Sequence, residues 1–391
     1  MEAEEVRKVA VVGAGCMGHG IAELFALHGY EVELVDLSEK ILREALRKIG
    51  KSLEMIEEAR GKEEEILGRI HPTVSLEEAL RGADFVLEAV TEKMDLKESL
   101  FRRMDRLTPP DVVLSTNTSC LSVTRLARAT SRPDKVVGTH FLHFPQHVDG
   151  FAPPQLTILL PLVEVVRTEC VAEEALELAK KLMRRIGKVP EEVKDTPAFV
   201  GNRILARLGL EAGRAVEEGF DAYEIDAACL YGLEMPMGIF QMLDAIGLDV
   251  AIYVSEYLGE TLGEEYRPPE ALRLMVEQGY LGQKTGKGFY DYSQGPPEAR
   301  REDWRDFDPL RLLAPAINEA CKMIEQGVAG GEKIERVLEL SFMPLGFLRL
   351  AERFGVKRIR EKLEELARRD KRYEPSPLLT GLSSFLELLQ V

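Results

Sequence analysis

The chain has 391 residues, which is long for one compact core, so we expect two or three domains. Hydrophobic residues make up 45% and charged residues 30%, which is typical of a soluble globular protein, and no apolar run has membrane-spanning length. The net charge of −16 argues against nucleic acid as a partner, because a phosphate backbone needs a cationic surface. Five scattered cysteines and an acidic N-terminus without a signal peptide predict reduced thiols and a cytoplasmic location.

Strand and helix signals alternate through the first 140 residues. The run "KVAVVG" predicts a buried strand, and "CMGHGIAELFALHG" predicts the helix after it, closed by Gly29. "EVELVD" predicts a second strand, and Ser38 is placed to cap one long helix over 38–60. Further strands are predicted in "ADFVLEAV", "DVVLSTN" and "KVVGTH". This alternation predicts an α/β domain with a parallel sheet covered by helices on both faces.

Strand signals stop near Asp195, and helical patterns continue from there to the C-terminus. A helix is predicted over 197–219, with Pro197 in its first turn. The helical half also contains a repeat at an offset of 108 residues. The identical pairs are Glu211/Glu319, Ala212/Ala320, Glu217/Glu325, Gly219/Gly327, Met235/Met343, Pro236/Pro344, Gly238/Gly346 and Gly247/Gly355. We therefore predict one α/β domain (1–194) followed by two related all-α domains (195–296 and 297–391).

The segment "GAGCMG" carries Gly13, Gly15 and Gly18 in a G-x-G-x-x-G spacing, between a predicted strand and a predicted helix. Glycines there permit a tight turn and close approach to a pyrophosphate, and the helix N-terminus offers N–H groups to phosphates. Asp36 ends the next predicted strand, where a carboxylate accepts from ribose hydroxyls and repels a 2′-phosphate. The pattern predicts a Rossmann-type domain that prefers NAD to NADP; a purely structural glycine turn is the alternative.

Half of the six histidines lie within eight residues: His140, His143 and His147. A helix would align them for a metal, but Pro145 argues against an uninterrupted helix and no Cys or Glu nearby completes a familiar zinc spacing. Proton transfer needs a carboxylate partner, and Glu164 lies in the apolar run "LVEVV", where burial without a partner is costly. On the residues alone, a metal site, a proton-transfer site and a loop without a role all stay open, as does a solvated strand face for Glu164.

Several segments together resemble one family over nearly the whole chain. They are "VAVVGAGCMGHGIAELFALHGYEVELVD", "FVLEAVTEKMDLK", "STNTSCLSVTRLA", "VVGTHF" with "LVEVV", "DTPAFVGNRI" and "GQKTGKGFYDY". These segments resemble the L-3-hydroxyacyl-CoA dehydrogenases of fatty-acid β-oxidation, which include 3-hydroxybutyryl-CoA dehydrogenases. The resemblance implies an NAD-dependent oxidoreductase that oxidises a (3S)-3-hydroxyacyl-CoA thioester to 3-oxoacyl-CoA, or runs the reverse reaction, without a metal.

The resemblance also assigns roles residue by residue. His140 matches the catalytic histidine and Glu164 its carboxylate partner. Ser119 and Asn202 match residues that hold the substrate oxygen, and Ser52 matches a residue near coenzyme A. The positions that match cofactor-contacting or nearby substrate-contacting residues are Gly13, Gly15, Met17, Gly18, Asp36, Glu92, Lys97 and Asn117. In this chemistry a neutral imidazole accepts the hydroxyl proton, and the carboxylate fixes its tautomer.

The segment between His140 and Glu164 departs from the family pattern. The two residues are 24 positions apart, further than in the family motif, and His143 stands where the family has Asn. We expect the insertion, residues 144–160, to pack over the site and to shape the acyl pocket or act as a lid. The alternative functions are a dehydrogenase of a free 3-hydroxy acid and an NAD-binding protein whose site the insertion blocks.

Two further features bear on partners. Lys40, Arg43, Arg47 and Lys51 share one face of a predicted helix, and this stripe either meets the phosphates of coenzyme A or is an ordinary solvated face. Family members with one helical domain commonly pair through it, whereas here the second copy can pack on the first. The second copy has Leu310 at the position equivalent to Asn202, so we predict one active site per chain. The expected assembly is a competent monomer with an internal pseudo-dimer, or a weak homodimer.

Overall fold

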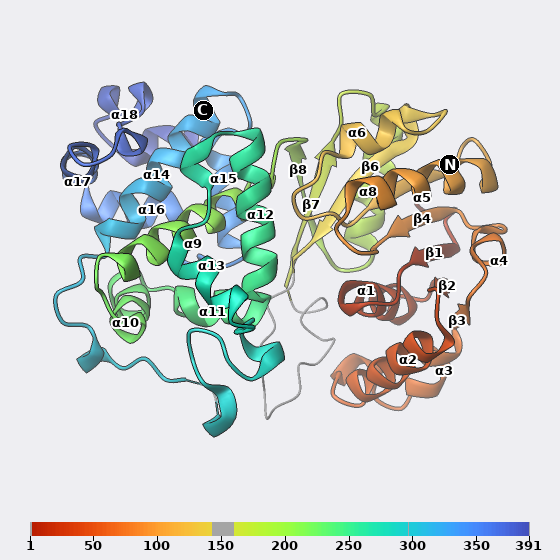
Figure 1. Cartoon of the computed structure of the whole chain (residues 1–391). Helices are drawn as coiled ribbons and strands as arrows, with labels where there is room; N and C mark the ends of the chain where they lie inside the picture. The colour runs from red at the N-terminus through yellow and green to blue at the C-terminus, as the bar shows by residue number, and fades with distance from the viewer. Residues whose placement is uncertain (1, 143–159, 296, 391) are drawn as a thin grey trace. The chain divides into compact units, whose positions relative to one another are not determined.

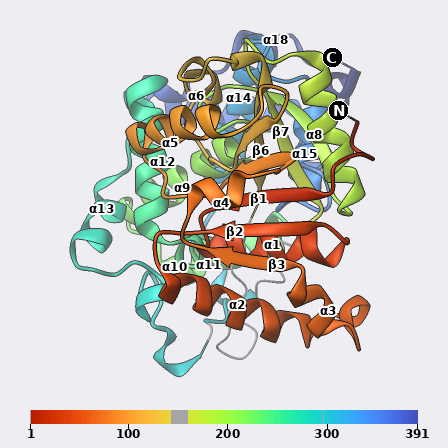
Figure 2. The same ribbon diagram turned by 90° about the vertical axis from the view of Figure 1, so that its right-hand side faces the viewer.

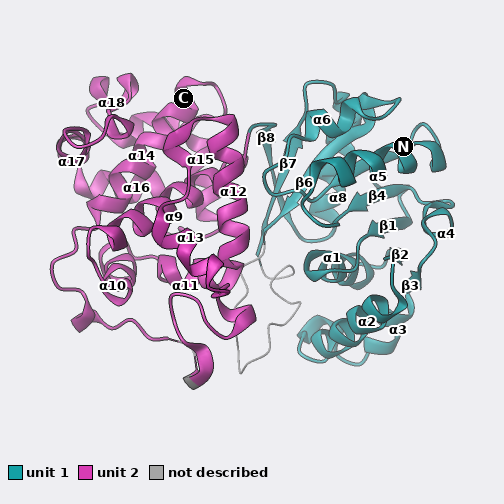
Figure 3. Ribbon diagram, in the orientation of Figure 1, with its two compact units in different colours: residues 1–196 teal, residues 197–391 magenta. Residues whose placement is uncertain are grey.

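The computed structural model describes residues 2–142, 160–295 and 297–390. The backbone divides into two compact units, residues 1–196 and residues 197–391 (Figure 3). In the described residues, every strand belongs to the first unit, and the second unit is built from helices and turns (Figure 1). The predicted architecture, an α/β domain followed by a helical region, is confirmed.

The strands that the structure describes form one eight-stranded sheet in the order β3-β2-β1-β4-β5-β6-β7-β8. Their bounds are β1 Lys8–Val12, β2 Glu31–Val35, β3 Ile70–Thr73, β4 Phe85–Glu88, β5 Val113–Thr116, β6 Val136–Phe141, β7 Leu162–Arg167 and β8 Val189–Lys194. The expected parallel pairing holds from β3 to β6 (Figure 2 shows β1, β2 and β3 side by side). β7 lies beyond the segment for which the parallel sheet was predicted, and it runs antiparallel to β6. An antiparallel neighbour sets residues directly opposite one another, and here it pairs His140 with Glu164.

Helices in the first unit are held on the sheet by apolar stripes. They are α1 Cys16–Leu27, α2 Glu39–Leu53, α3 Glu63–Gly68, α4 Leu76–Leu80, α5 Met94–Leu107, α6 Val123–Arg128 and α8 Glu173–Arg185. Gly29 follows α1 with a φ of 86°, and the Ser38 side chain accepts from Lys40 N, so both predicted helix ends are confirmed.

The single long helix expected over 38–60 is wrong, because α2 ends at Leu53 and a short 3₁₀ turn at Glu57–Ala59 follows. The buried stripe of α2 runs through Ala45, Ile49 and Leu53. Continuing the helix would bring Glu57 and Arg60, four and seven residues after Leu53, onto that same buried face. The chain therefore turns where the apolar spacing stops.

The second unit begins with a strained turn rather than with a helix. Its helices are α9 Gly201–Glu217, α10 Ala222–Gly232, α11 Ile239–Ile246, α12 Leu248–Thr261, α13 Glu270–Glu277, α14 Leu310–Glu325, α15 Gly331–Glu339, α16 Phe347–Phe354, α17 Val356–Ala367 and α18 Pro377–Gly381. The helix expected from Pro197 was wrong, because Ala198 and Phe199 have φ values of 59° and 51°. Both side chains are completely buried, and their packing compensates for the left-handed backbone.

The sequence repeat corresponds to a repeat of structure within the second unit. In the first half, the Asp226 carboxylate accepts from Phe240 N (2.8 Å) at the start of α11. In the second half, the Glu335 carboxylate accepts from Leu348 N (2.6 Å) at the start of α16, 108 residues after Phe240. The same carboxylate-to-helix contact therefore occurs twice, which supports the predicted duplication.

The two halves meet through a buried set of ion pairs on α9 and α14. Arg203 Nε donates to Glu319 (2.6 Å), and Arg311 Nη1 donates to Glu211 (2.6 Å). Each residue of one pair lies 108 positions from its counterpart in the other. Two tyrosine hydroxyls complete the arrangement. Tyr266 of the first half donates to Glu319, and Tyr373 of the second half donates to Glu211. The contact is therefore reciprocal, as in a symmetric pair of subunits.

None of the helices in the described part of the chain combines the length and the apolar character needed to cross a membrane.

Candidate active site

The turn between β1 and α1 leaves room that only glycine permits. Gly13 has a φ of 105°, and a Cβ there would lie 2.6 Å from the Ala89 carbonyl oxygen. A Cβ at Gly18 would collide with the Gly13 carbonyl. A Cβ at exposed Gly15 would meet no atom within 4 Å among the described residues, so glycine keeps the space before the helix N-terminus clear. These residues fit a dinucleotide pyrophosphate.

Asp36 is held against this turn. Its carboxylate accepts from Ala14 N (2.8 Å) and from Leu37 N (2.7 Å), and the residue is half-buried at the end of β2. Asp36, which is predicted to bind the ribose, thus also holds the glycine-rich segment in place. Met17, another predicted cofactor contact, is half-buried and packs against the core of the unit.

A buried ion pair supports the next part of the site. Lys97 Nζ lies 2.7 Å from Glu88 and 3.3 Å from Glu92, and Lys97 is 1% exposed. Although burial lowers it, the two carboxylates raise the pKa of Lys97 overall. Sequence reasoning missed Glu88, whose position at the end of an apolar strand resembles that of Asp36. Lys97 therefore links Glu88 to Glu92.

Glu92 in turn holds the backbone that presents Ser119. Its Oε1 accepts from Ser119 N (2.8 Å) and from the Thr118 hydroxyl. Asn117 Oδ1 accepts from Phe141 N (2.8 Å) and so joins the ends of β5 and β6. Predicted residues from separate segments thus gather at the carboxyl edge of the parallel strands, where open α/β sheets bind ligands.

His140 and Glu164 form a buried pair on the antiparallel strands. His140 Nδ1 lies 2.7 Å from Glu164 Oε2, and the two residues are 2% and 0% exposed. The carboxylate accepts from Nδ1, so Nε2 is left as the basic nitrogen of the neutral ring. The solvated strand face considered for Glu164 is wrong, since the residue is fully buried. Asn202 lies in the first turn of α9, in the second unit, and is half-buried.

Ser52, which the resemblance puts near coenzyme A, is completely buried on α2. Glu23 of α1 is also fully buried. Among the described residues, neither the Ser52 hydroxyl nor the Glu23 carboxylate has a hydrogen-bond partner. Burial raises the pKa of Glu23 to about 8, so this carboxyl keeps its proton at neutral pH. The sequence signal that could have indicated a buried Glu23 carboxyl is its place as the single charged residue in the apolar run "GIAELFAL".

The basic stripe of α2 is exposed along its length: Lys40, Arg43, Arg47 and Lys51. Two of its members already pair with acids on the same helix. Arg43 lies 3.2 Å from Glu39, and Arg47 lies 2.6 Å from Glu44. These pairs favour an ordinary solvated face for the two arginines.

His143, His147 and almost all of the predicted insertion lie outside the described residues. In the part of the chain that the structure describes, no group of three or more His, Cys, Asp or Glu side chains could hold a metal.

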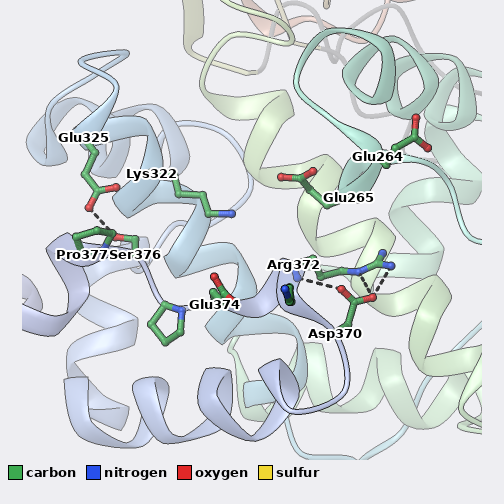
Figure 4. Close-up of a pocket in the computed structure, with 11 residues that line it drawn as sticks. Glu264, Glu265, Lys322, Glu325, Asp370, Arg372, Glu374, Ser376 and Pro377 are labelled. Atoms are coloured by element: carbon green, nitrogen blue, oxygen red, sulfur yellow. Dashed lines mark hydrogen bonds and ion pairs between the residues drawn. The ribbon is translucent and has the colours of Figure 1, made fainter.

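A separate cavity of about 550 Å³ lies in the second unit (Figure 4). Its lining comes from both helical halves and carries both charge signs: Glu264, Glu265, Lys322, Glu325, Asp370, Lys371, Arg372, Glu374, Pro375, Ser376 and Pro377. Some of these charges are already paired, as in the contact of Arg372 with Asp370 (2.6 Å). None of the predicted site residues lines this cavity.

Comparisons with known proteins identify the family. The family model "3-hydroxyacyl-CoA dehydrogenase, NAD binding domain" matches residues 8–196. The model "3-hydroxyacyl-CoA dehydrogenase, C-terminal domain" matches twice, over 199–292 and 309–388.

Similar proteins include dehydrogenases of 3-hydroxybutyryl-CoA and of hydroxyacyl-coenzyme A. The chain is 38% identical to a probable 3-hydroxybutyryl-CoA dehydrogenase of Bacillus subtilis, over 74% of this chain and 99% of the relative. It is 33% identical to the human mitochondrial hydroxyacyl-coenzyme A dehydrogenase, over 73% of this chain and 91% of the relative. The crystal structure of 3-hydroxybutyryl-CoA dehydrogenase from Escherichia coli is similar over 96% of this chain and 98% of its own, with 27% identity and a TM-score of 0.82.

Proposed function

Because the chain belongs to the 3-hydroxyacyl-CoA dehydrogenase family, we propose that its buried His140–Glu164 pair carries out the proton transfer of an NAD-dependent reaction on 3-hydroxyacyl-CoA. In this proposal the (3S)-3-hydroxy group is oxidised to a 3-oxo group, or the reverse. The reaction belongs to fatty-acid metabolism, as a step of β-oxidation, and takes place in the cytoplasm.

His140 acts as the general base. Its Nε2 accepts the proton of the substrate hydroxyl as a hydride leaves the carbon that bears this hydroxyl. In the reverse direction Nε2 returns the proton. Bound NAD supplies the hydride acceptor. Glu164 keeps the Nδ1 proton in place and stabilises the imidazolium that forms, because a buried cation needs a partner charge.

Ser119 and Asn202 orient the reacting oxygen in this proposal. Ser119 is held by the Glu92 carboxylate through its backbone N–H, so its position is set before substrate binds. Asp36 accepts hydrogen bonds from the adenosine ribose and repels a 2′-phosphate, which makes NAD the preferred dinucleotide.

A spectrophotometric assay tests this function. We expect NADH to be consumed with acetoacetyl-CoA and with longer 3-oxoacyl-CoA thioesters, and NADPH to be a far poorer reductant. Free acetoacetate is the matched control without coenzyme A. Turnover of the free acid alone would favour a 3-hydroxy acid dehydrogenase. Tight NADH binding without any turnover would favour a blocked site, and equal kcat/KM for NADH and NADPH would remove the role given to Asp36.

We also infer that one chain is a complete catalytic unit. The reciprocal contact of α9 with α14 buries the ionic face of both helical copies within the chain, and the second copy has Leu310 where the first has Asn202. Light scattering across a dilution series should therefore give the mass of a single chain, with constant activity per chain. Activity that falls on dilution, together with a dimer mass, contradicts this inference.

A further inference from the structure

His19 is a buried histidine next to the glycine-rich turn that the proposed chemistry does not use. It lies on α1, one turn after Gly15, and is 5% exposed. Its Nδ1 lies 2.6 Å from the Gly15 carbonyl oxygen, and the same oxygen accepts from His19 N at 3.2 Å. Two donors of one residue therefore hold a single carbonyl of the turn.

The tautomer of His19 follows from this contact. Burial lowers the pKa of the imidazole, as does the charge of nearby Lys48, whereas the Gly15 carbonyl and Glu44 act in the opposite direction. A neutral ring has one N–H, and a carbonyl oxygen can only accept, so the proton is on Nδ1. At the 2.6 Å distance between Nδ1 and the Gly15 carbonyl oxygen, the imidazole therefore donates a hydrogen bond to Gly15.

The direction of the Gly15 carbonyl determines the direction of the Cys16 N–H. Both groups belong to one planar trans peptide unit, in which the C=O and N–H bonds point opposite ways. The carbonyl points into the helix, toward His19, so the N–H points out of the helix N-terminus. N–H groups that point out of a helix N-terminus in this way, after a glycine-rich turn, are the ones that bind a dinucleotide pyrophosphate.

We propose that His19 is a positioning residue that orients the Gly15–Cys16 peptide so that its N–H points toward the cofactor pyrophosphate. The benefit is preorganisation, because a peptide that is already oriented need not be ordered when the ligand binds. This inference rests on NAD binding by the family's domain and not on the identity of the acyl substrate.

Paired amide variants test the proposal. The amide nitrogen of Asn stands where Nδ1 stands in His, whereas that of Gln stands near the position of Nε2. We expect H19N to keep the dissociation constant of NADH within about twofold, and H19Q and H19L to raise it about 3- to 10-fold, the loss of one hydrogen bond. The affinity for ADP-ribose, which carries the pyrophosphate without nicotinamide, should fall by the same factor. At saturating NADH, kcat should not change.

His28 offers a matched control on the same helix. Its Nδ1 lies 2.9 Å from the Leu24 carbonyl oxygen, the same contact four residues back but at the far end of α1. H28L should leave the affinities for NADH and ADP-ribose unchanged. Melting temperatures without ligand identify damage to the fold. Equal affinities of H19N and H19Q, full affinity in H19L, or an equal loss in H28L would overturn the proposal. These binding measurements need no turnover, so their outcome is independent of whether the proposed reaction takes place.

Discussion

Replacing His140 with Gln is expected to lower turnover of acetoacetyl-CoA at least about 100-fold, while NADH still binds. Gln has no basic nitrogen, so it can hydrogen-bond to the substrate but cannot take up the hydroxyl proton. The imidazole lies at the end of β6, whereas the dinucleotide turn follows β1, so cofactor affinity should be retained. Stopped-flow or steady-state NADH oxidation measures kcat, and fluorescence titration measures the NADH dissociation constant.

Two further variants make this result specific. Glu164→Gln should also lower kcat, because the amide cannot stabilise an imidazolium at a distance of 2.7 Å from Nδ1. His143→Ala should have a much smaller effect, since no catalytic role is assigned to that residue. An inactive H143A together with an active H140Q would show that the base has been assigned to the wrong histidine.

Replacing Glu319 with Gln is expected to destabilise the helical unit by about 3–5 kcal/mol. Glu319 is 1% exposed and serves Arg203 and Arg207, which are 1% and 3% exposed. Burial opposes ionisation, yet the two arginines hold the pKa of Glu319 below its usual value. Neutral Gln keeps the shape but removes the negative charge that Arg203 and Arg207 share, and leaves Arg207 only its longer contact with Glu211 (3.6 Å). Trp304, the single tryptophan, lies in this unit, so its fluorescence reports urea unfolding there.

An exposed pair between the same two halves is the control. Arg353 Nη2 lies 2.6 Å from Glu234, but their side chains are 58% and 39% exposed. Because solvent screens such a pair, Glu234→Gln should cost less than about 1 kcal/mol. Glu211→Gln, the counterpart of the Glu319 change, should behave like E319Q. If E319Q were no more destabilising than E234Q, the buried ion pairs would not be what joins the two halves.

The sequence predicted those parts of the molecule that depend on local spacing. The strand, glycine-rich turn and helix around Gly13, Gly15 and Gly18 lie where the pattern puts them, because backbone conformation at glycine is a local property. The helix ends at Gly29 and Ser38 follow from the same local chemistry. The repeat was visible because identical Gly, Pro and Glu residues keep one register.

Other features depended on which segments pack together. The end of α2 at Leu53 and the left-handed turn at Ala198 and Phe199 follow from burial against distant residues, which overrides helix propensity. The resemblance implied roles for Glu92 and Lys97, but only the structure shows that Lys97 is buried and contacts Glu92. The sequence pattern did not indicate a role for His19, because its partner is the backbone carbonyl of Gly15 and not a side chain.

The sequence by itself determined strands β1, β2, β4, β5 and β6, the dinucleotide turn, the duplicated helical segment and the residue types available for catalysis, since each depends on neighbours along the chain, but it did not predict β3 or β8. Only the tertiary structure decided that β7 turns back beside β6. That reversal sets His140 opposite Glu164, which lies 24 positions later in the chain, and gives the imidazole its partner. The tertiary structure likewise decided that Arg203 pairs with Glu319 and Arg311 with Glu211, because a buried charge is stable only where the fold brings an opposite charge to it.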